Sequence, residues 1–347
     1  MRRLGIAVIA VVVLTACDRI LGIEEGTPWP IDGSGDPFDA FGDPPDGRRG
    51  DAPPVTSCEA LDATCGPMGN LSCCDSPLIE GGTFYRGYDV AFDALYDDMS
   101  APATVSAFRL DRYEVTVGRF RRFVDAGMGT QANPPTPGAG ARTLNGEAAQ
   151  GGWDPSWNAM LPGDATALRA SLKCGSPTQT WTDDPADQEN LPIVCISWFE
   201  AMAFCVWDGG FLPTEAEAMY ASSGGSLQRA FPWSSPAYAT DIDCSQANYA
   251  GCLPAAIHEV GSLSPAGDGV WEHADLAGNV WEWALDWEID PFPMPCTDCA
   301  TLTEGSYRII RGGSFYNVEG FLRAARRGYD SPEIGYDNSG LRCARAP

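Results

Sequence analysis

The clearest hydrophobic pattern in the chain predicts a short amphipathic helix that begins after Thr116. Phe120, Phe123 and Val124 follow at a spacing that places them on one face of a helix. The hydroxyl of Thr116 can accept a hydrogen bond from a free backbone N–H of the first turn, which suits it as the N-cap. Gly127 is suited to end the helix, because glycine readily adopts the left-handed conformation in which many helices stop.

Two further helices are predicted by the spacing of capping boxes. Ser197 precedes Glu200 by three residues, and Thr214 precedes Glu217 by three. In a capping box, the hydroxyl and the carboxylate each accept a hydrogen bond from the backbone N–H of the other residue, which satisfies two donors at the start of the helix. Apolar residues such as Phe204 follow the first box, so we expect that helix to be buried.

The strands that the pattern predicts are few and short. Residues 107–115 alternate between apolar and polar side chains, and residues 307–310 form a second candidate strand. The chain contains 39 glycines and 28 prolines among 347 residues, so long loops must join these elements. The pattern therefore favours a loop-rich α+β fold over a helical bundle.

The first residues have the organisation of an export signal. Two arginines precede an apolar run over residues 4–14, which is too short to span a bilayer, since that takes about 20 residues. The sequence LTAC at 14–17 resembles the lipobox of bacterial lipoproteins, whose signal is cut before a cysteine that then receives acyl chains. We expect residues 1–16 to be a lipoprotein signal peptide and Cys17 to be the lipidation site; the alternative is an ordinary signal peptide. The protein would then lie in the bacterial cell envelope, outside the cytoplasm and bound to the membrane through its lipid anchor only.

Residues 17–57 are expected to form a disordered tether. They are rich in proline, glycine and acidic residues, a composition that buries too little apolar surface to order a chain. Residues 58–77 follow as a short stub with four cysteines, Cys58, Cys65, Cys73 and Cys74. We expect the folded domain to occupy residues 78–347.

The cysteine count agrees with export. The chain contains 13 cysteines, and a lipidated Cys17 leaves an even number for disulfide bonds, which persist in exported proteins. Cys296 and Cys299 could instead belong to a zinc site, but no second pair at this spacing and no nearby histidine complete a tetrahedral ligand set. We therefore expect disulfide bonds, and the spacing leaves their pairing open.

The charge of the chain excludes one large class of partner. Acidic residues number 47 and basic residues 22, which gives a formal net charge of −25. Nucleic acids are bound through clustered lysines and arginines that displace counterions from the phosphates, so we expect no nucleic-acid partner. Arg323, Arg326 and Arg327 could form a site for an acidic ligand, but in so acidic a chain we expect them to pair with its own carboxylates.

Seven segments in a fixed order together resemble a known family. They are EVTVGRFRRFVDAG (114–127), LPIVCISWFEAMAFCVW (191–207), LPTEAEA (212–218), FPW (231–233), DLAGNVWEW (275–283), RGGS (311–314) and GLRCAR (340–345). In this respect the chain is similar to the formylglycine-generating enzymes, also called sulfatase-modifying factors, over about residues 81–345. The resemblance implies a C-type-lectin-like α+β fold with little regular secondary structure. Activity has to be judged at the site residues, because function lies in sites rather than in folds.

Residues 275–282 place a carboxylate at each end of a tight turn. Gly278 allows the backbone to bend so that carbonyl groups between Asp275 and Glu282 can point at one cation. Calcium prefers such a mixture of carboxylate and carbonyl oxygens; the alternative is a turn with two solvated acids. The resemblance implies calcium here, held by the side chains of Asp275 and Glu282 and by the carbonyl groups of Gly278 and Val280.

A second calcium site is the weaker expectation. Asn248 and Tyr249 match half of the ligand set that the resemblance implies for it. The acid expected downstream is absent from residues 251–261, unless Glu259 takes its place. Calcium is accordingly the cofactor that we expect, at one site or at two.

The catalytic site that the resemblance implies is incomplete. Family members that oxidise a cysteine bind copper through two cysteines just after RGGS, and thiolates are the ligands that Cu(I) prefers. Here Asn317 stands at the first of these positions, and the second falls in a shortened segment without cysteine. Ser314 matches an active-site serine of the family. We expect no copper, and Ser314 and Asn317 remain candidate site residues by position alone.

Three functions remain compatible with the sequence. The leading one is a calcium-stabilised binding or assembly module that recognises a peptide, a polysaccharide or an envelope protein. The second is an active formylglycine-generating oxidase that acts on exported sulfatases. The third is another enzyme on the same scaffold, for example a hydrolase that pairs Ser314 with His258 or His273. An iron centre with three histidines is disfavoured, because the chain has only these two.

Overall fold

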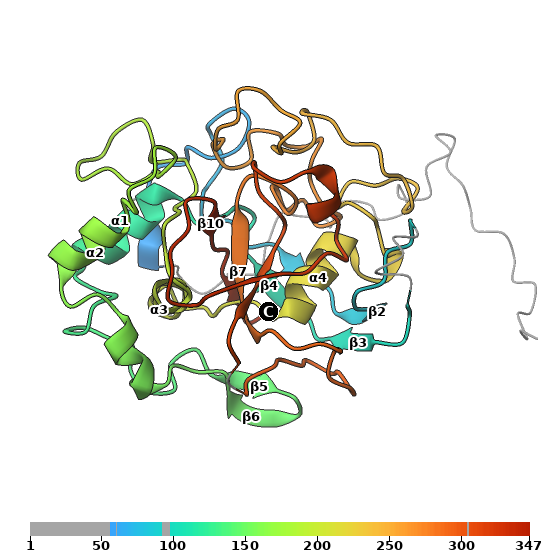
Figure 1. The fold of residues 1–347 in the computed structure, drawn as a ribbon, viewed down its shortest axis with the longest axis horizontal. Coiled ribbons are helices and arrows are strands. Elements are labelled where there is room, and N and C mark those ends of the chain that lie inside the picture. The colour runs from blue at the N-terminus through green and yellow to red at the C-terminus, as the bar shows by residue number, and fades with distance from the viewer. Residues whose placement is uncertain (1–55, 60, 92–97, 304) are drawn as a thin grey trace, which may run out of the picture. The chain divides into compact units, whose positions relative to one another are not determined.

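The fold has the mixed, loop-rich character that the sequence predicts (Figure 1). The computed structural model describes residues 56–59, 61–91, 98–303 and 305–347. The expected signal peptide, Cys17 and all but the last two residues of the expected tether lie outside these described residues. Within the described part, no helix combines the length and the apolar character needed to cross a membrane.

All three predicted helices are present with their predicted N-caps. They are α1 (Val117–Asp125), α3 (Trp198–Trp207) and α4 (Glu215–Ser223). The hydroxyl of Thr116 accepts a hydrogen bond from the backbone N–H of Arg119, and both capping boxes are formed reciprocally. The described residues add one α-helix and four 3-10 helices, namely α2 (Ala165–Ser171), η1 (Thr56–Cys58), η2 (Pro155–Met160), η3 (Gly225–Leu227) and η4 (Glu319–Phe321).

The strands form four small sheets in the described part of the chain. They are β1 (Leu78–Ile79), β2 (Gly82–Tyr85), β3 (Pro102–Val105), β4 (Phe108–Leu110), β5 (Arg142–Leu144), β6 (Glu147–Gln150), β7 (Trp281–Trp287), β8 (Arg308–Arg311), β9 (Gly328–Asp330), β10 (Ser339–Gly340) and β11 (Ala344–Arg345). The strand orders are β1-β4-β11, β10-β7-β8-β9, β2-β3 and β5-β6. In the four-stranded sheet, β7 pairs antiparallel with β8 and parallel with β10.

The two predicted strands have different bounds from those expected. The strand expected over 107–115 is regular only in β4. After Leu110 the backbone N–H groups donate to two different segments: Asp111 and Val115 to Cys343 and Leu341, and Arg112, between them, to Asp75. No single neighbouring strand therefore continues the ladder. The second strand, β8, begins at Arg308 rather than one residue earlier.

The largest hydrophobic cluster joins α1 and α3 to the four-stranded sheet. Phe204 of α3 lies 5.3 Å from Phe120 and 5.6 Å from Phe123 of α1, measured between ring centroids. Helices α3 and α4 both contact β7, and Figure 1 shows them on opposite sides of this strand. This packing fixes β7, which contains the last two residues of the expected calcium segment, between the two helices.

The expected disulfide bonding is confirmed. The 12 cysteines of the described residues form the pairs Cys58–Cys74, Cys65–Cys73, Cys174–Cys195, Cys205–Cys343, Cys244–Cys252 and Cys296–Cys299. Cys205 of α3 and Cys343 beside β11 are both fully buried, and they tie the middle of the chain to its end.

The cysteine-rich stub packs into the same folded unit, which corrects the expected boundary at residue 78. Cys65 and Cys73 share a buried cluster with Tyr113 and Val260. Ser57, from the end of the expected tether, is also fully buried. This packing could not be predicted from the sequence, because cysteines and small polar residues in an irregular segment have no hydrophobic periodicity.

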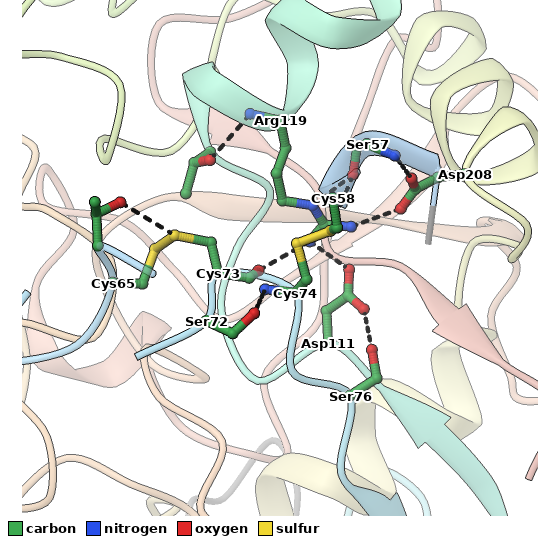
Figure 2. Close-up of a disulfide and its surroundings, with 12 residues drawn as sticks. Ser57, Cys58, Cys65, Ser72, Cys73, Cys74, Ser76, Asp111, Arg119 and Asp208 are labelled. Carbon is green, nitrogen blue, oxygen red and sulfur yellow. Dashed lines mark hydrogen bonds and ion pairs between the residues drawn. A yellow bond between two sulfur atoms is a disulfide. The ribbon is translucent and has the colours of Figure 1, made fainter. Parts of the chain in front are cut away.

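Four fully buried charged side chains attach the stub to the domain. Arg119 pairs with Asp111 at 2.8 Å and with Asp208 at 2.6 Å. Arg345 pairs with the same two carboxylates. Figure 2 shows the stub side of this network, where the backbone N–H of Ser57 donates to Asp208 at 2.6 Å. Two positive and two negative charges thus balance inside the core.

Asp286 on β7 predicts an unusual dependence of stability on pH. Its carboxylate is buried and accepts hydrogen bonds from the backbone N–H groups of Glu215 and Thr301, both at 2.7 Å. Burial and the neighbouring Glu215 raise its pKa from 3.8 to about 7. The folded domain therefore binds a proton between about pH 7 and pH 4 that the unfolded chain does not bind, so this group adds stability as the pH falls, by at most about 1.4 kcal/mol per pH unit.

The measurement is urea unfolding of the wild type and Asp286→Asn at several values of pH between 7.5 and 4.5. The free energy of unfolding of the wild type, minus that of the variant, should increase as the pH falls, because asparagine cannot take up the proton. A difference that stays constant across this range would contradict the prediction.

Candidate functional site

The chain reverses direction after β8 at the RGGS segment. Gly312 and Gly313 have φ values of +93° and +79°, a backbone conformation that glycine adopts with little strain. The bend turns the side chain of Ser314 inward, where it is fully buried. The expected site residues therefore lie at a sharp turn beside the central sheet.

The side chain of Asn317 holds this turn together. Its amide oxygen accepts hydrogen bonds from the backbone N–H of Ser314 at 3.0 Å and from the Ser314 hydroxyl at 2.7 Å. Asn338 donates to the same hydroxyl at 3.3 Å, and the carbonyl of Asn317 accepts from the backbone N–H of Ala250 at 2.9 Å. The structure thus brings the two candidate residues together, in an arrangement of neutral oxygen and nitrogen groups.

No pair of thiols lies at the turn in the described part of the chain. Every cysteine there is bound in a disulfide, and Cys343 of the GLRCAR segment is joined to Cys205. A disulfide sulfur is not a thiolate, and Cu(I) selects thiolates. The described residues therefore do not fit the two-thiolate copper site of the oxidases.

The two histidines do not meet Ser314. The hydroxyl of Ser314 donates to Asn317 instead. His273 is fully buried and its Nε2 bonds the carbonyl of Leu110 at 3.1 Å. The backbone of His258 bonds the side chain of Asn279. A hydrolase pair of serine and histidine is therefore not formed at this turn.

The two segments expected to bind calcium lie next to each other. The backbone N–H of Asn279 donates to the carbonyl of Asn248 at 2.9 Å, and the side-chain nitrogen of Asn248 donates to the side-chain oxygen of Asn279 at 3.1 Å. The side-chain oxygen of Asn248, Oδ1, is buried without a hydrogen-bond partner among the described residues. A buried oxygen in this state is costly, and a hard cation is one group that would satisfy it.

The other expected ligands of the weaker site are engaged or exposed. The carbonyl of Tyr249 accepts a hydrogen bond from the backbone N–H of Cys252 at 2.9 Å. Glu259, the possible substitute for the missing acid, is exposed to solvent. Of this site, Asn248 is thus the residue whose environment fits a cation.

The two carboxylates of the stronger site differ in their surroundings. Asp275 is partly buried, it accepts a hydrogen bond from the backbone N–H of Gly261 at 2.6 Å, and burial raises its pKa to about 6. Glu282 is instead bound to the guanidinium of Arg342, with nitrogen–oxygen distances of 2.8–3.2 Å. No group of three or more His, Cys, Asp or Glu side chains in the described residues has a metal-binding arrangement.

Glu114 is a third buried carboxylate in this region, which the sequence did not reveal as a site residue. It accepts hydrogen bonds from the side chain of Asn279 at 2.6 Å and from the backbone N–H of Val280 at 3.1 Å. Burial, with Asp275 and Glu282 nearby, raises its pKa well above the usual value. The one indication in the sequence was that Glu114 is an acidic residue within the segment 107–115, which alternates between apolar and polar side chains.

Two arginines near the C-terminus, Arg323 and Arg327, pair with carboxylates of the chain, as expected. Arg323 binds Asp89 and Arg327 binds Glu215, each at 2.7 Å. Arg326 lies over the ring of Phe321, 4.6 Å from its centroid. Arg323 and Arg327 are therefore not a ready-made cluster for an acidic ligand.

Comparison with known proteins agrees with these motifs. The model of the family described as "Sulfatase-modifying factor enzyme 1-like domain" matches residues 64–347. The formylglycine-generating enzyme of Thermomonospora curvata is 30% identical over 304 residues, which cover 78% of this chain and 92% of that protein. The hercynine oxygenase of Mycolicibacterium smegmatis is 29% identical over 287 residues, which cover 78% of this chain and 60% of that protein.

Two solved structures share the fold. PvdO from Pseudomonas aeruginosa superposes with a TM-score of 0.53 at 20% identity, over 79% of this chain and 95% of its own. Treponema denticola variable protein 1 has a TM-score of 0.51 at 18% identity, over 78% and 95%. The expected C-type-lectin-like α+β fold is thereby confirmed, and the chain belongs to the sulfatase-modifying factor family, whose formylglycine-generating enzymes it resembles in sequence over most of its length.

Proposed function

We propose that this protein is a binding module of its family and not a copper-dependent oxidase. The observation that supports this most directly is Asn317. It stands where the oxidases have a copper-binding cysteine, and its amide oxygen is already engaged by Ser314 at 2.7 Å. An amide is a hard donor that cannot replace a thiolate towards Cu(I). Family membership alone does not fix the reaction, because the relatives include both formylglycine-generating enzymes and a hercynine oxygenase.

The test measures copper binding and product formation together. The purified protein and the formylglycine-generating enzyme of Thermomonospora curvata, as positive control, are titrated with Cu(I) against a colorimetric chelator. Both are then incubated in air with a peptide containing Cys-x-Pro-x-Arg, and the peptide is analysed by mass spectrometry. We expect this protein to compete poorly for Cu(I) and to leave the cysteine unchanged. Conversion of the cysteine to an aldehyde would refute the proposal.

We also propose that the protein is a lipoprotein of the bacterial cell envelope, anchored through Cys17. The lipobox-like sequence before Cys17 supports this, as do the six disulfide bonds of the described residues, which are typical of exported proteins. Metabolic labelling with an alkyne fatty acid should modify the wild type and leave Cys17→Ala unlabelled. Equal labelling of both proteins would contradict the anchor.

Calcium is the cofactor that we propose for residues 275–282 and Asn248. Two features support it: Oδ1 of Asn248 has no hydrogen-bond partner among the described residues, and three carboxylates, Glu114, Asp275 and Glu282, lie close together near the guanidinium of Arg342. Asp275 would supply a side-chain oxygen together with the carbonyl groups of Gly278 and Val280, and Asn248 would supply its Oδ1 at the weaker second site. Glu282 fits less well, because it already binds Arg342. A bound cation would neutralise carboxylates that are otherwise costly to bury.

Removal of calcium should therefore destabilise the domain. A ligand present at about 100 times its dissociation constant adds about 2.7 kcal/mol, which corresponds to roughly 5–10 °C of melting temperature for a domain of this size. We expect EGTA to lower the melting temperature by this amount, and calcium but not magnesium to restore it. Asp275→Asn should melt lower than the wild type and respond less to EGTA. An unchanged wild-type melting temperature would remove calcium from the proposal.

A further inference from the structure

A large cavity lies outside the Ser314 turn. It has a volume of about 800 Å³ and is lined by residues from four segments, 86–87, 98–101, 288–294 and 326–329. Ser314 and Asn317 do not contribute to its wall. A cavity of this size accommodates a small organic molecule or a few residues of a peptide.

Arg86 is a buried cation in this wall that forms no ion pair within 4 Å in the described part of the chain, although the carboxylates of Glu215 and Asp286 lie near enough to act on its charge. The residue is 4% exposed. Its guanidinium donates to the carbonyl of Pro293 at 2.6 Å and contacts the sulfur atoms of Cys299 and Met294 at 3.3 Å. Its Nε is buried and has no hydrogen-bond partner among the described residues. Burial lowers the pKa of this side chain, and a carboxylate brought into the cavity would compensate the buried charge.

Phe292 provides an apolar surface beside this cation. Its ring lies between two guanidinium groups, with the centroid 4.8 Å from Arg86 and 4.2 Å from Arg327. Arg327 already pairs with Glu215, so Arg86 is the stronger candidate for an external anion. Met294 and Tyr329 extend the apolar part of the wall.

Three acidic residues line the same cavity, namely Asp98, Glu288 and Asp290. Asp98 and Asp290 are exposed, and Glu288 is partly exposed. Asp98 accepts hydrogen bonds from the backbone N–H and the hydroxyl of Ser100, both at 2.7 Å. Glu288 lies close enough to Arg327 to raise the pKa of that arginine. The wall thus presents a buried cation, an apolar surface and three carboxylates.

These charges select against ligands of a single sign. An anion would meet Asp290 and Glu288, as well as the repulsion of a chain with a net charge of −25. A simple cation would meet the guanidinium groups of Arg86 and Arg327. A ligand that carries both charges, with an apolar group between them, satisfies all three parts of the wall.

We propose that this cavity binds a short peptide segment that carries one acidic and one basic side chain. The acidic side chain faces Arg86, an apolar side chain packs on Phe292, and the basic side chain faces Asp290 and Glu288. This proposal is independent of the missing copper site, since none of the residues involved belongs to the Ser314 turn.

The probe is the capped tripeptide N-acetyl-Lys-Phe-Glu-amide, titrated into the full chain by isothermal titration calorimetry. Two neutral versions replace either its lysine or its glutamate by glutamine. Each replacement should weaken binding roughly tenfold, the effect of losing one charge-assisted hydrogen bond. Equal affinity for all three peptides, or no heat of binding up to millimolar concentration, would overturn the proposal.

Variants locate the site. The Asp290→Asn variant should bind the original peptide and the peptide with glutamine in place of lysine with similar affinity. The Arg86→Gln variant should bind the original peptide and the peptide with glutamine in place of glutamate with similar affinity. Because Arg86 is buried, its variant is used only if its melting curve remains cooperative. Ser100→Trp places a large ring at an exposed position of the cavity wall and should abolish binding. Ser245→Trp, at an exposed position outside that wall, is the matched control. Wild-type affinity of Ser100→Trp would place binding elsewhere and refute the proposal.

Discussion

Asp208→Ala is expected to destabilise the domain by about 3–5 kcal/mol. Asp208 is fully buried and forms ion pairs with Arg119 at 2.6 Å and with Arg345 at 2.7 Å. Its second oxygen accepts the backbone N–H of Ser57 at 2.6 Å (Figure 2). Removing this carboxylate leaves two guanidinium groups with only Asp111 to balance them in the interior. An uncompensated buried charge costs far more than an exposed one.

The measurement is the free energy of unfolding from urea titrations, with Asp183→Ala as the matched control. Asp183 also pairs with a cation, Lys173, at 2.7 Å, but both side chains are about half exposed. We expect its loss to cost far less than the loss of Asp208, because an exposed ion pair is screened by solvent. The stub should also become accessible to protease in Asp208→Ala, because Ser57 loses its acceptor. Similar costs for the two variants would show that the buried network does not stabilise the attachment of the stub.

Removal of the Cys205–Cys343 disulfide should have an effect of similar or larger size. The two residues are 138 positions apart in the sequence and both are fully buried. A cross-link that closes so long a loop restricts the unfolded chain strongly, and chain-entropy arguments give about 5 kcal/mol. The double variant Cys205→Ala/Cys343→Ala also leaves small voids where the sulfur atoms packed, which adds to the loss.

Cys296 and Cys299 provide the control within the same protein. Their disulfide joins residues only 3 positions apart, for which the same argument gives about 1.5 kcal/mol. Melting curves and urea titrations of the two double alanine variants should therefore differ clearly. If removal of the short-range bond cost as much as removal of the long-range bond, loop closure would not be the main source of the stabilisation.

The candidate site was predictable in its composition but not in its contacts. The order of the motifs placed Ser314 and Asn317 at one turn, and the structure joins them by three hydrogen bonds. The ion pair of Glu282 with Arg342 was not predictable, because 60 positions separate these residues. Glu114 was missed for the same reason, since its neighbours Asp275 and Glu282 come from a distant segment.

Local chemistry in the sequence determined the helices and the absence of a copper ligand. Thr116, Ser197 and Thr214 cap their helices through atoms within three residues, and Asn317 offers no sulfur in any conformation. The tertiary structure alone decided the disulfide pairing, the inclusion of the stub in the folded unit and the balance of buried charge. Each of these depends on groups that are far apart along the chain, and Asp208, which joins Ser57 to Arg119 and Arg345, has a partner only after folding has brought them together.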